Sequence, residues 1–153
     1  MTKLALRSIG LLLLAIAVSA CSAPPYTNLS NEQLEPLLEQ DIAVYDIRRP
    51  LEWQQTGVIE GSRLMTFVDS DGRVLPDFLT RFTEQTAKDQ PVILICRTGN
   101  RTRTLARHLV EQLGYTQVYN VRGGIRDWIR EGGAVVRIDY TESDTAREAG
   151  AEL

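Results

Sequence analysis

The residues in this sequence best suited to chemistry are a cysteine and two arginines in one short loop. The loop reads Cys96, Arg97, Thr98, Gly99, Asn100 and Arg101. A cysteine attacks as its thiolate, and nearby positive charge favours that ionised form. Arg97 and Arg101 supply such charge, and a loop containing glycine can turn backbone N–H groups inward to hold an anion. The pattern predicts a nucleophilic thiol in an anion-binding loop rather than an inert core cysteine.

Two predicted elements position this loop. Residues 91–95 are almost wholly apolar and typical of a buried strand. Residues 102–113 carry leucine at every fourth position, as an amphipathic helix does. Cys96 should therefore lie at the carboxyl end of a strand and the amino end of a helix. Unpaired N–H groups at a helix start add to the attraction for an anion.

The remaining chain alternates between the same two kinds of element. Strands are predicted over residues 42–45, 63–67 and 117–120, and helices over residues 30–38, 50–55, 76–86 and 125–130, the last with Ile125, Trp128 and Ile129 inward. This alternation indicates an α/β fold with a mostly parallel central sheet and helices on both faces. In such folds the ligand site lies at the carboxyl ends of the strands.

Three stretches together resemble one family. Besides the Cys96 loop, residues 46–53 read Asp-x-Arg-x-Pro-x-Glu-Trp, and residues 123–128 read Gly-Gly-x-x-x-Trp. In this order they resemble the rhodanese-like sulfurtransferases. One departure is Val58, where the family usually has histidine. That position is usually structural, so the departure leaves the expected chemistry intact.

The resemblance implies a specific reaction. Cys96 would take sulfane sulfur from an anion such as thiosulfate, carry it as a persulfide, and pass it to cyanide or a thiol. Residues 97–101 would bind the substrate and the persulfide. No cofactor is expected, because the thiol itself carries the sulfur. No metal is expected either, since no cluster of ligand residues stands out and His108 is the only histidine.

Two further residues of the family signature have open roles. Asp46 and Arg48 follow a predicted strand. Arg48 either faces an anion at Cys96 or pairs with an acidic side chain, and the sequence favours neither. Both are therefore candidate site residues.

Two other function classes remain as alternatives. Cysteine phosphatases and some arsenate reductases need Cys followed by five residues and Arg, but here Arg101 comes one position early and Thr102 follows it. The shorter loop favours sulfur over a tetrahedral oxyanion. The other alternative is a non-catalytic binding module, against which the retained Cys96 and loop arginines argue.

The amino terminus resembles a bacterial lipoprotein signal peptide. Lys3 and Arg7 precede an apolar run, and Val-Ser-Ala-Cys ends at Cys21. We expect cleavage after residue 20, lipid on Cys21, and a location on the periplasmic side of a membrane. Because Ser22 follows the cysteine, the sequence favours the outer membrane over the inner one. The expected divisions are a signal peptide (1–20), a tether (21–29), the rhodanese-like domain (30–138) and a disordered acidic tail (139–153).

The net charge of the chain limits the classes of partner that it is expected to bind. The formal charge is −3, and losing residues 1–20, with two basic and no acidic residues, makes it −5. An acidic chain argues against nucleic acid as a partner. A monomer is expected, with a small sulfur anion, a thiol or cyanide, and the lipid anchor as its partners.

Overall fold

The computed structural model describes residues 23–139. The expected signal peptide, Cys21 and all of the expected tail beyond Asp139 lie outside the described residues. Within residues 23–139 no helix is both long and apolar enough to cross a membrane.

The centre of the fold is one parallel sheet. Its strands are β1 (Thr27–Leu29), β2 (Val44–Asp46), β3 (Arg63–Leu64), β4 (Val92–Ile95) and β5 (Val118–Val121). They lie in the order β1-β5-β4-β2-β3, and every neighbouring pair is parallel. The predicted α/β fold with a mostly parallel sheet is confirmed.

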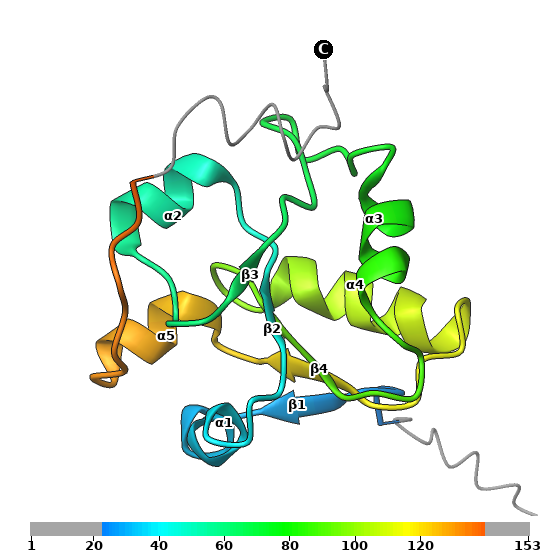
Figure 1. Cartoon of the computed structure of the whole chain (residues 1–153), viewed down its shortest axis with the longest axis horizontal. Helices are drawn as coiled ribbons and strands as arrows, with labels where there is room; N and C mark the ends of the chain where they lie inside the picture. Colours follow the sequence, from blue (N-terminus) through cyan, green and yellow to red (C-terminus); the bar gives the residue numbers. More distant parts are fainter. Residues whose placement is uncertain (1–22, 140–153) are drawn as a thin grey trace, which may run out of the picture.

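Helices connect the strands and cover the sheet. They are α1 (Asn31–Leu38), α2 (Pro50–Thr56), α3 (Phe78–Gln85), α4 (Asn100–Glu111) and α5 (Gly124–Arg130). In Figure 1, α3 and α4 lie together on one side of the sheet, whereas α1 and α5 lie on the other. The expectation of helices on both faces is met.

The alternation of side chains along β4 builds two cores. Ile93 and Ile95 join the core beneath α1 and α5. Val92, Leu94 and the following Cys96 join the core beneath α3 and α4. Successive side chains in a strand point to opposite faces. Because helices cover both faces of the sheet, every residue of β4 is buried. The register of β4 therefore directs Cys96 toward the face that carries α4.

Local sequence signals set the helix starts. Ser30 caps α1, and its side chain and that of Gln33 bond each other's backbone N–H groups. Pro36 is accommodated inside this helix. Pro50 opens α2, where its fixed φ suits the first helical position and its missing N–H costs nothing.

Several details differ from the sequence-based expectation. The tether expected over 21–29 is shorter, because residues 27–29 form β1 and Leu29 is buried against the sheet. The active-site helix begins at Asn100, two residues earlier than predicted, since Gly99 is its N-cap. Ile129 was expected to face inward, but 38% of it is exposed, because α5 is short and buries only Ile125 and Trp128 of its apolar residues.

Candidate active site

Cys96 lies directly after β4 and is almost fully buried, with 1% of its surface exposed. Its sulfur lies 3.5 Å from the hydroxyl oxygen of Thr102, which is also buried. Its carbonyl oxygen accepts a hydrogen bond of 2.9 Å from the N–H of Ile125 on α5. Cys96 is thus fixed from three elements: β4, α4 and α5.

The loop after Cys96 keeps its backbone donors available. Among residues 23–139, no acceptor receives a hydrogen bond from the N–H groups of residues 97–102. The last three of these belong to the first turn of α4, where a helix has no acceptors of its own to offer. A run of unengaged N–H groups beside a thiol is a setting that stabilises an anion.

Two glycines allow this loop to pack against the start of α5. Gly99 has a φ of +82°, and a Cβ there would come within 2.1 Å of the Arg122 carbonyl oxygen. Gly124 has a φ of +62°, and a Cβ there would come within 2.4 Å of the Cys96 carbonyl oxygen. Any side chain at either position would push the two loops apart. The second glycine of the Gly-Gly pair therefore supports the geometry of the cysteine loop.

Arg101 is held by Glu52, which sequence reasoning did not single out as a site residue. Its two terminal nitrogens donate to the two carboxylate oxygens at 2.8 and 2.6 Å. Burial would raise the pKa of Glu52, but hydrogen bonds from Arg101 and the Arg49 backbone outweigh it and lower that pKa to about 2. Glu52 is therefore a carboxylate throughout the neutral range.

Arg101 is also influenced by Cys96. Burial would lower the pKa of Arg101, but Glu52, and after it Cys96, raise it above its ordinary value. The guanidinium is thus a cation that Glu52 holds near Cys96. The role of Arg101 in stabilising negative charge on sulfur stays a prediction.

The other predicted loop residues occupy more open positions. Arg97 is exposed, and no ion pair within residues 23–139 engages its guanidinium. Its carbonyl oxygen accepts from the N–H of Arg126. Thr98 is half-buried, and Asn100 is exposed at the first position of α4.

Asp46 and Arg48 form a buried structural pair instead of facing the sulfur. Arg48 is 1% exposed, and two of its nitrogens bond the Asp46 carboxylate. Its remaining donors reach the Thr56 hydroxyl and the carbonyls of Glu52 and Gly57. All five N–H groups of the guanidinium are engaged, so Arg48 has none left for an anion at Cys96. The second of the two readings of Arg48 holds.

A polar chain behind Cys96 was missed by sequence reasoning. Thr102 donates to the Asn120 side chain at 2.6 Å, and Asn120 donates to the Asn28 side chain at 2.7 Å. This chain connects the sulfur through α4 and β5 to β1. The signal was present, because Asn120 is a buried polar residue in the otherwise apolar strand β5. Such a residue needs a partner.

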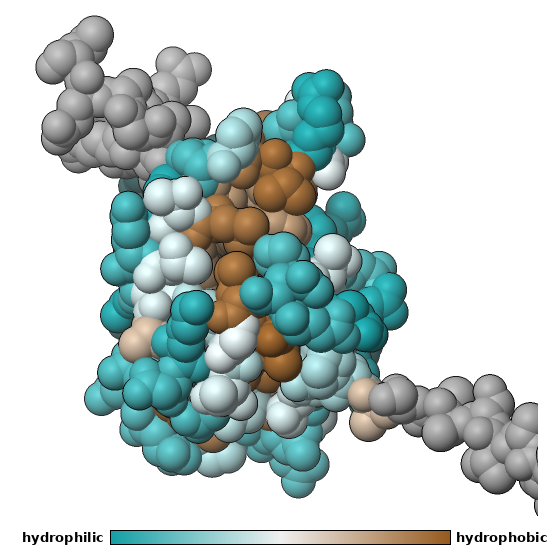
Figure 2. Space-filling model, turned by 90° about the vertical axis from the view of Figure 1, so that its right-hand side faces the viewer, coloured by the Kyte–Doolittle hydropathy of each residue, from teal (hydrophilic) through white to brown (hydrophobic). Residues whose placement is uncertain are grey.

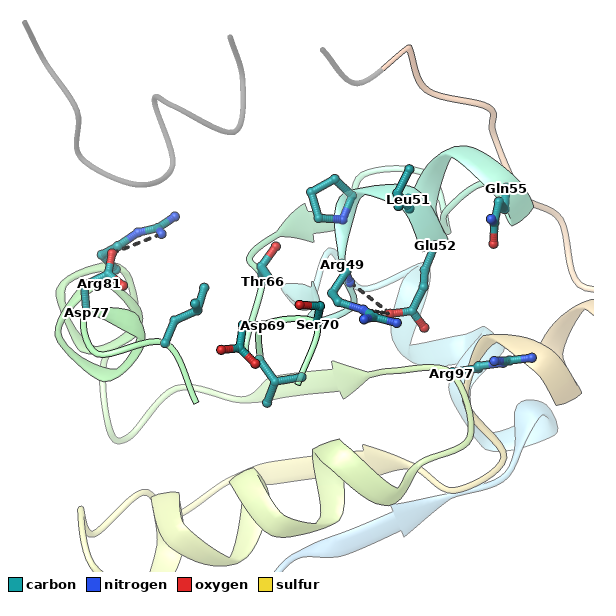
Figure 3. Close-up of a pocket in the computed structure, with 13 residues that line it drawn as sticks. Arg49, Leu51, Glu52, Gln55, Thr66, Asp69, Ser70, Asp77, Arg81 and Arg97 are labelled. Carbon is teal, nitrogen blue, oxygen red and sulfur yellow. Dashed lines mark hydrogen bonds and ion pairs between the residues drawn. The ribbon is translucent and has the colours of Figure 1, made fainter. Parts of the chain in front are cut away.

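A cleft of about 600 Å³ opens beside the cysteine loop. Figure 3 shows residues of α2 on one side, Thr66, Asp69 and Ser70 across from them, and Arg97 on the loop after β4. The cleft thus begins at Arg97, the residue that follows Cys96.

Comparison with known proteins agrees with this site. The rhodanese-like domain family matches residues 30–131, which is most of the chain, and the chain belongs to that family. The match includes the cysteine loop, residues 46–53 and the Gly-Gly pair.

Individual relatives agree with the family. The chain is 30% identical over 104 residues to the thiosulfate sulfurtransferase GlpE of Tolumonas auensis, covering 67% of this chain and 88% of that protein. It is 35% identical over 98 residues to a sulfurtransferase of Allochromatium vinosum, covering 63% and 80%. A rhodanese-related protein from Thermoplasma volcanium superposes with a TM-score of 0.55 at 28% identity, covering 72% and 98%.

Proposed function

We propose that this protein is a sulfurtransferase that moves sulfane sulfur from an anionic donor such as thiosulfate, through a persulfide on Cys96, to a thiophilic acceptor. The observation that supports the proposal is the Cys96 sulfur near Arg101, in a loop whose N–H groups from 97 to 102 have no acceptor among residues 23–139. Sulfurtransferase relatives support the same reaction class.

The first half-reaction begins with the Cys96 thiolate. It attacks the outer sulfur of thiosulfate, a sulfur–sulfur bond to Cys96 forms, and the bond to the sulfonate breaks so that sulfite leaves with the electron pair. In the second half-reaction cyanide or a thiol takes the outer sulfur, and Cys96 returns as a thiolate. The loop N–H groups and Arg101 stabilise the negative charge that stays on sulfur throughout.

The test is the mass of the intact protein with and without thiosulfate. Incubation should add one sulfur atom at Cys96, and cyanide should remove it. Cys96→Ser should gain no mass and have no transfer activity, because a hydroxyl is not ionised near neutral pH. Circular dichroism of this variant controls for folding.

The same experiment separates sulfur transfer from phosphatase chemistry. A phosphatase would hydrolyse an aryl phosphate, and the mass of the protein would not change on incubation with thiosulfate. That pair of results, or full transfer activity in Cys96→Ser, would reject the proposal.

We also propose that the mature protein is lipid-anchored through Cys21 and faces the periplasm, at the outer membrane. The support is the sequence alone: an apolar run followed by Val-Ser-Ala-Cys, with Ser22 next. In detergent phase separation the protein should partition with detergent, and Cys21→Ala should move it to the aqueous phase. Partitioning that survives Cys21→Ala would contradict the anchor.

A further inference from the structure

We propose that Thr102, Asn120 and Asn28 form a hydrogen-bond chain whose direction reverses with the charge on Cys96. When Cys96 is a thiol, the chain offers it an acceptor, and when Cys96 is a thiolate, the chain offers it a donor. Thr102 touches the sulfur, and the two asparagines are positioning residues that act through it. The inference rests on the proposed function and deepens it, because it names residues that stabilise the anion on which sulfur transfer depends.

The chain runs from the buried sulfur to the edge of the sheet. The Cys96 sulfur lies 3.5 Å from the Thr102 hydroxyl oxygen. Thr102 donates to the Oδ1 of Asn120 at 2.6 Å, and the Nδ2 of Asn120 donates to the Oδ1 of Asn28 at 2.7 Å. Asn28 and Asn120 are paired residues of the neighbouring strands β1 and β5, so their side chains lie on the same face of the sheet. Each link of the chain is thus a direct contact.

The direction of the chain in the structure suits a thiol. The Thr102 hydroxyl has one proton, and Asn120 receives it. Thr102 therefore faces the sulfur with a lone pair, which accepts from the S–H of a thiol. A thiolate instead needs a donor. Thr102 and Asn120 are buried, with 0% and 2% of their surface exposed, so a donor on this side of the sulfur has to come from the chain itself.

The far end of the chain allows the reversal. Asn28 is exposed on the edge strand β1, so its amide can turn over and exchange hydrogen bonds with water. Figure 2 shows largely hydrophilic surface near the place where the described chain begins. Asn120 then turns its Nδ2 toward Thr102, and the Thr102 hydroxyl donates to the sulfur. Every link is again a donor facing an acceptor, as buried polar groups require.

The reversal changes no charged group around Cys96. These groups are Arg97 in the loop, Arg101 held by Glu52, and the ion pair of Asp46 with Arg48 at the end of the neighbouring strand β2. The start of α5 meets Cys96 with backbone atoms, and β5 meets the chain with an uncharged side chain. Each hydrogen of the chain stays on its own atom, and the proton that the thiol loses goes to water. A change in the chain can therefore be measured at the sulfur with its charged neighbours intact.

The experiment titrates Cys96 in the full chain by the ultraviolet absorbance of its thiolate, with Cys96→Ser as the background. Asn28→Asp has nearly the shape of the wild type, but its carboxylate only accepts hydrogen bonds. It fixes the Nδ2 of Asn120 toward residue 28, so the Thr102 hydroxyl cannot donate to the sulfur. The titration curve should move up by about one pH unit, which is tenfold in the ionisation equilibrium.

Asn28→Ala separates this effect from a structural role. It removes the partner of Asn120 but leaves the chain free to reverse, because water can take the place of the lost amide, and the curve should move by less than about 0.3 pH unit. If Asn28 only held Asn120 in place, alanine would be worse than aspartate, which keeps the hydrogen bond. Thr27→Asp is the control for charge, since it adds the same charge on the opposite face of β1. It should also move the curve by less than about 0.3 pH unit.

Two further measurements connect the chain to the sulfur and to the reaction. Thr102→Val has the shape of threonine without its hydroxyl and should also move the curve up, whereas Thr102→Ser keeps the hydroxyl and should follow the wild type. Circular dichroism controls for the folding of both. At a pH below the titration, Asn28→Asp should take sulfur from thiosulfate about threefold more slowly, because the more basic thiolate is scarcer but partly compensates by its greater nucleophilicity.

The outcomes separate the two proposals. The reversible chain is overturned if Asn28→Asp leaves the titration of Cys96 unchanged, or if Asn28→Ala or Thr27→Asp moves it as far as Asn28→Asp does. If the wild type takes no sulfur from thiosulfate, the proposed function fails, and the titrations still decide whether the chain reverses.

Discussion

At the scale of single residues, Glu52 fixes the position of the Arg101 guanidinium near Cys96. Its side chain accepts from both terminal nitrogens of Arg101 and from the backbone N–H of Arg49. The same carboxylate thus begins α2 and orients the guanidinium of α4. A long side chain such as Arg101 loses less freedom on binding an anion when a partner already holds it.

We predict that Glu52→Gln lowers both activity and stability. The variant keeps the size of the side chain but removes its charge, so the hold on Arg101 weakens. We expect kcat/KM for thiosulfate to fall about tenfold, the change that 1.4 kcal/mol of lost transition-state stabilisation produces. Steady-state kinetics with thiosulfate and cyanide measure this, and unchanged kinetics would show that Arg101 needs no support.

The stability effect should depend on pH. The folded Glu52 pKa is about 2, against an ordinary 4.5, so the folded state binds fewer protons than the unfolded state between these values. The stabilisation is therefore complete above pH 4.5 and is lost as pH falls toward 2. Urea unfolding should show wild type more stable than Glu52→Gln by on the order of 2 kcal/mol at pH 7, with the gap closing below pH 4.5.

A surface ion pair provides the control for this measurement. Glu111 pairs with Arg107 one turn away on α4, and both side chains are exposed. Glu111→Gln should change the free energy of unfolding by less than about 0.5 kcal/mol at any pH. Equal losses in the two variants would mean that net charge, not the contact with Arg101, sets the stability.

At the scale of elements, the start of α5 supports the cysteine loop. The N–H groups of Ile125 and Arg126 donate to the carbonyls of Cys96 and Arg97. These bonds form only because Gly124 lets the two backbones approach. The loop geometry is therefore shared between β4, α4 and α5.

We predict that Gly124→Ala is far more harmful than Gly114→Ala. Both glycines have positive φ, +62° and +76°, so each substitution incurs the left-handed cost of about 1–2 kcal/mol. Only at Gly124 would the new Cβ also collide with backbone, since nothing lies within 4 Å of the position at Gly114. Gly124→Ala should lose about 1–3 kcal/mol more, and its transfer activity should fall at least tenfold.

Unfolding curves and thiosulfate kinetics of the two variants measure this difference. Gly114→Ala should keep wild-type kinetics, because Gly114 follows α4 at the end away from Cys96. Similar stability and activity in both variants would mean that the contact between α5 and the loop is adaptable.

At the scale of the whole molecule, β1 completes the sheet although it precedes the residues that match the family. It pairs with β5 and buries Leu29, while Tyr26 just before it packs into the core under α3 and α4. Asn28 on β1 also receives the hydrogen bond from Asn120 behind Cys96. The amino-terminal strand thus contributes to both the core and the site.

We predict that two truncations behave differently. A chain starting at residue 23 keeps every described contact and serves as the reference for the free energy of unfolding. A chain starting at residue 30 should lose several kcal/mol, because burial of Tyr26 and Leu29 contributes about 1.5–3 kcal/mol each. Urea denaturation measures both, and equal stability of the two truncations would show that β1 is dispensable.

The local unit around Cys96 could be predicted from the sequence. A run of apolar residues, a polar loop with Gly99 and a leucine repeat are neighbours in the chain, so their pattern specifies strand, turn and helix directly. The alternation of such units then gave the parallel sheet, and parallel strands place Cys96 at a carboxyl edge.

Only the tertiary structure decided which charged groups are free to act. Arg48 and Arg101 look alike in the sequence. Arg48 forms a buried ion pair with Asp46. Arg101 pairs with Glu52, 49 residues away, and lies near Cys96. Among residues 23–139 no ion pair engages Arg97, and the cleft beside it is lined by α2 and the segment before α3. Pairing and clefts arise from packing between elements distant in the chain, and no local pattern encodes which partner a long side chain reaches.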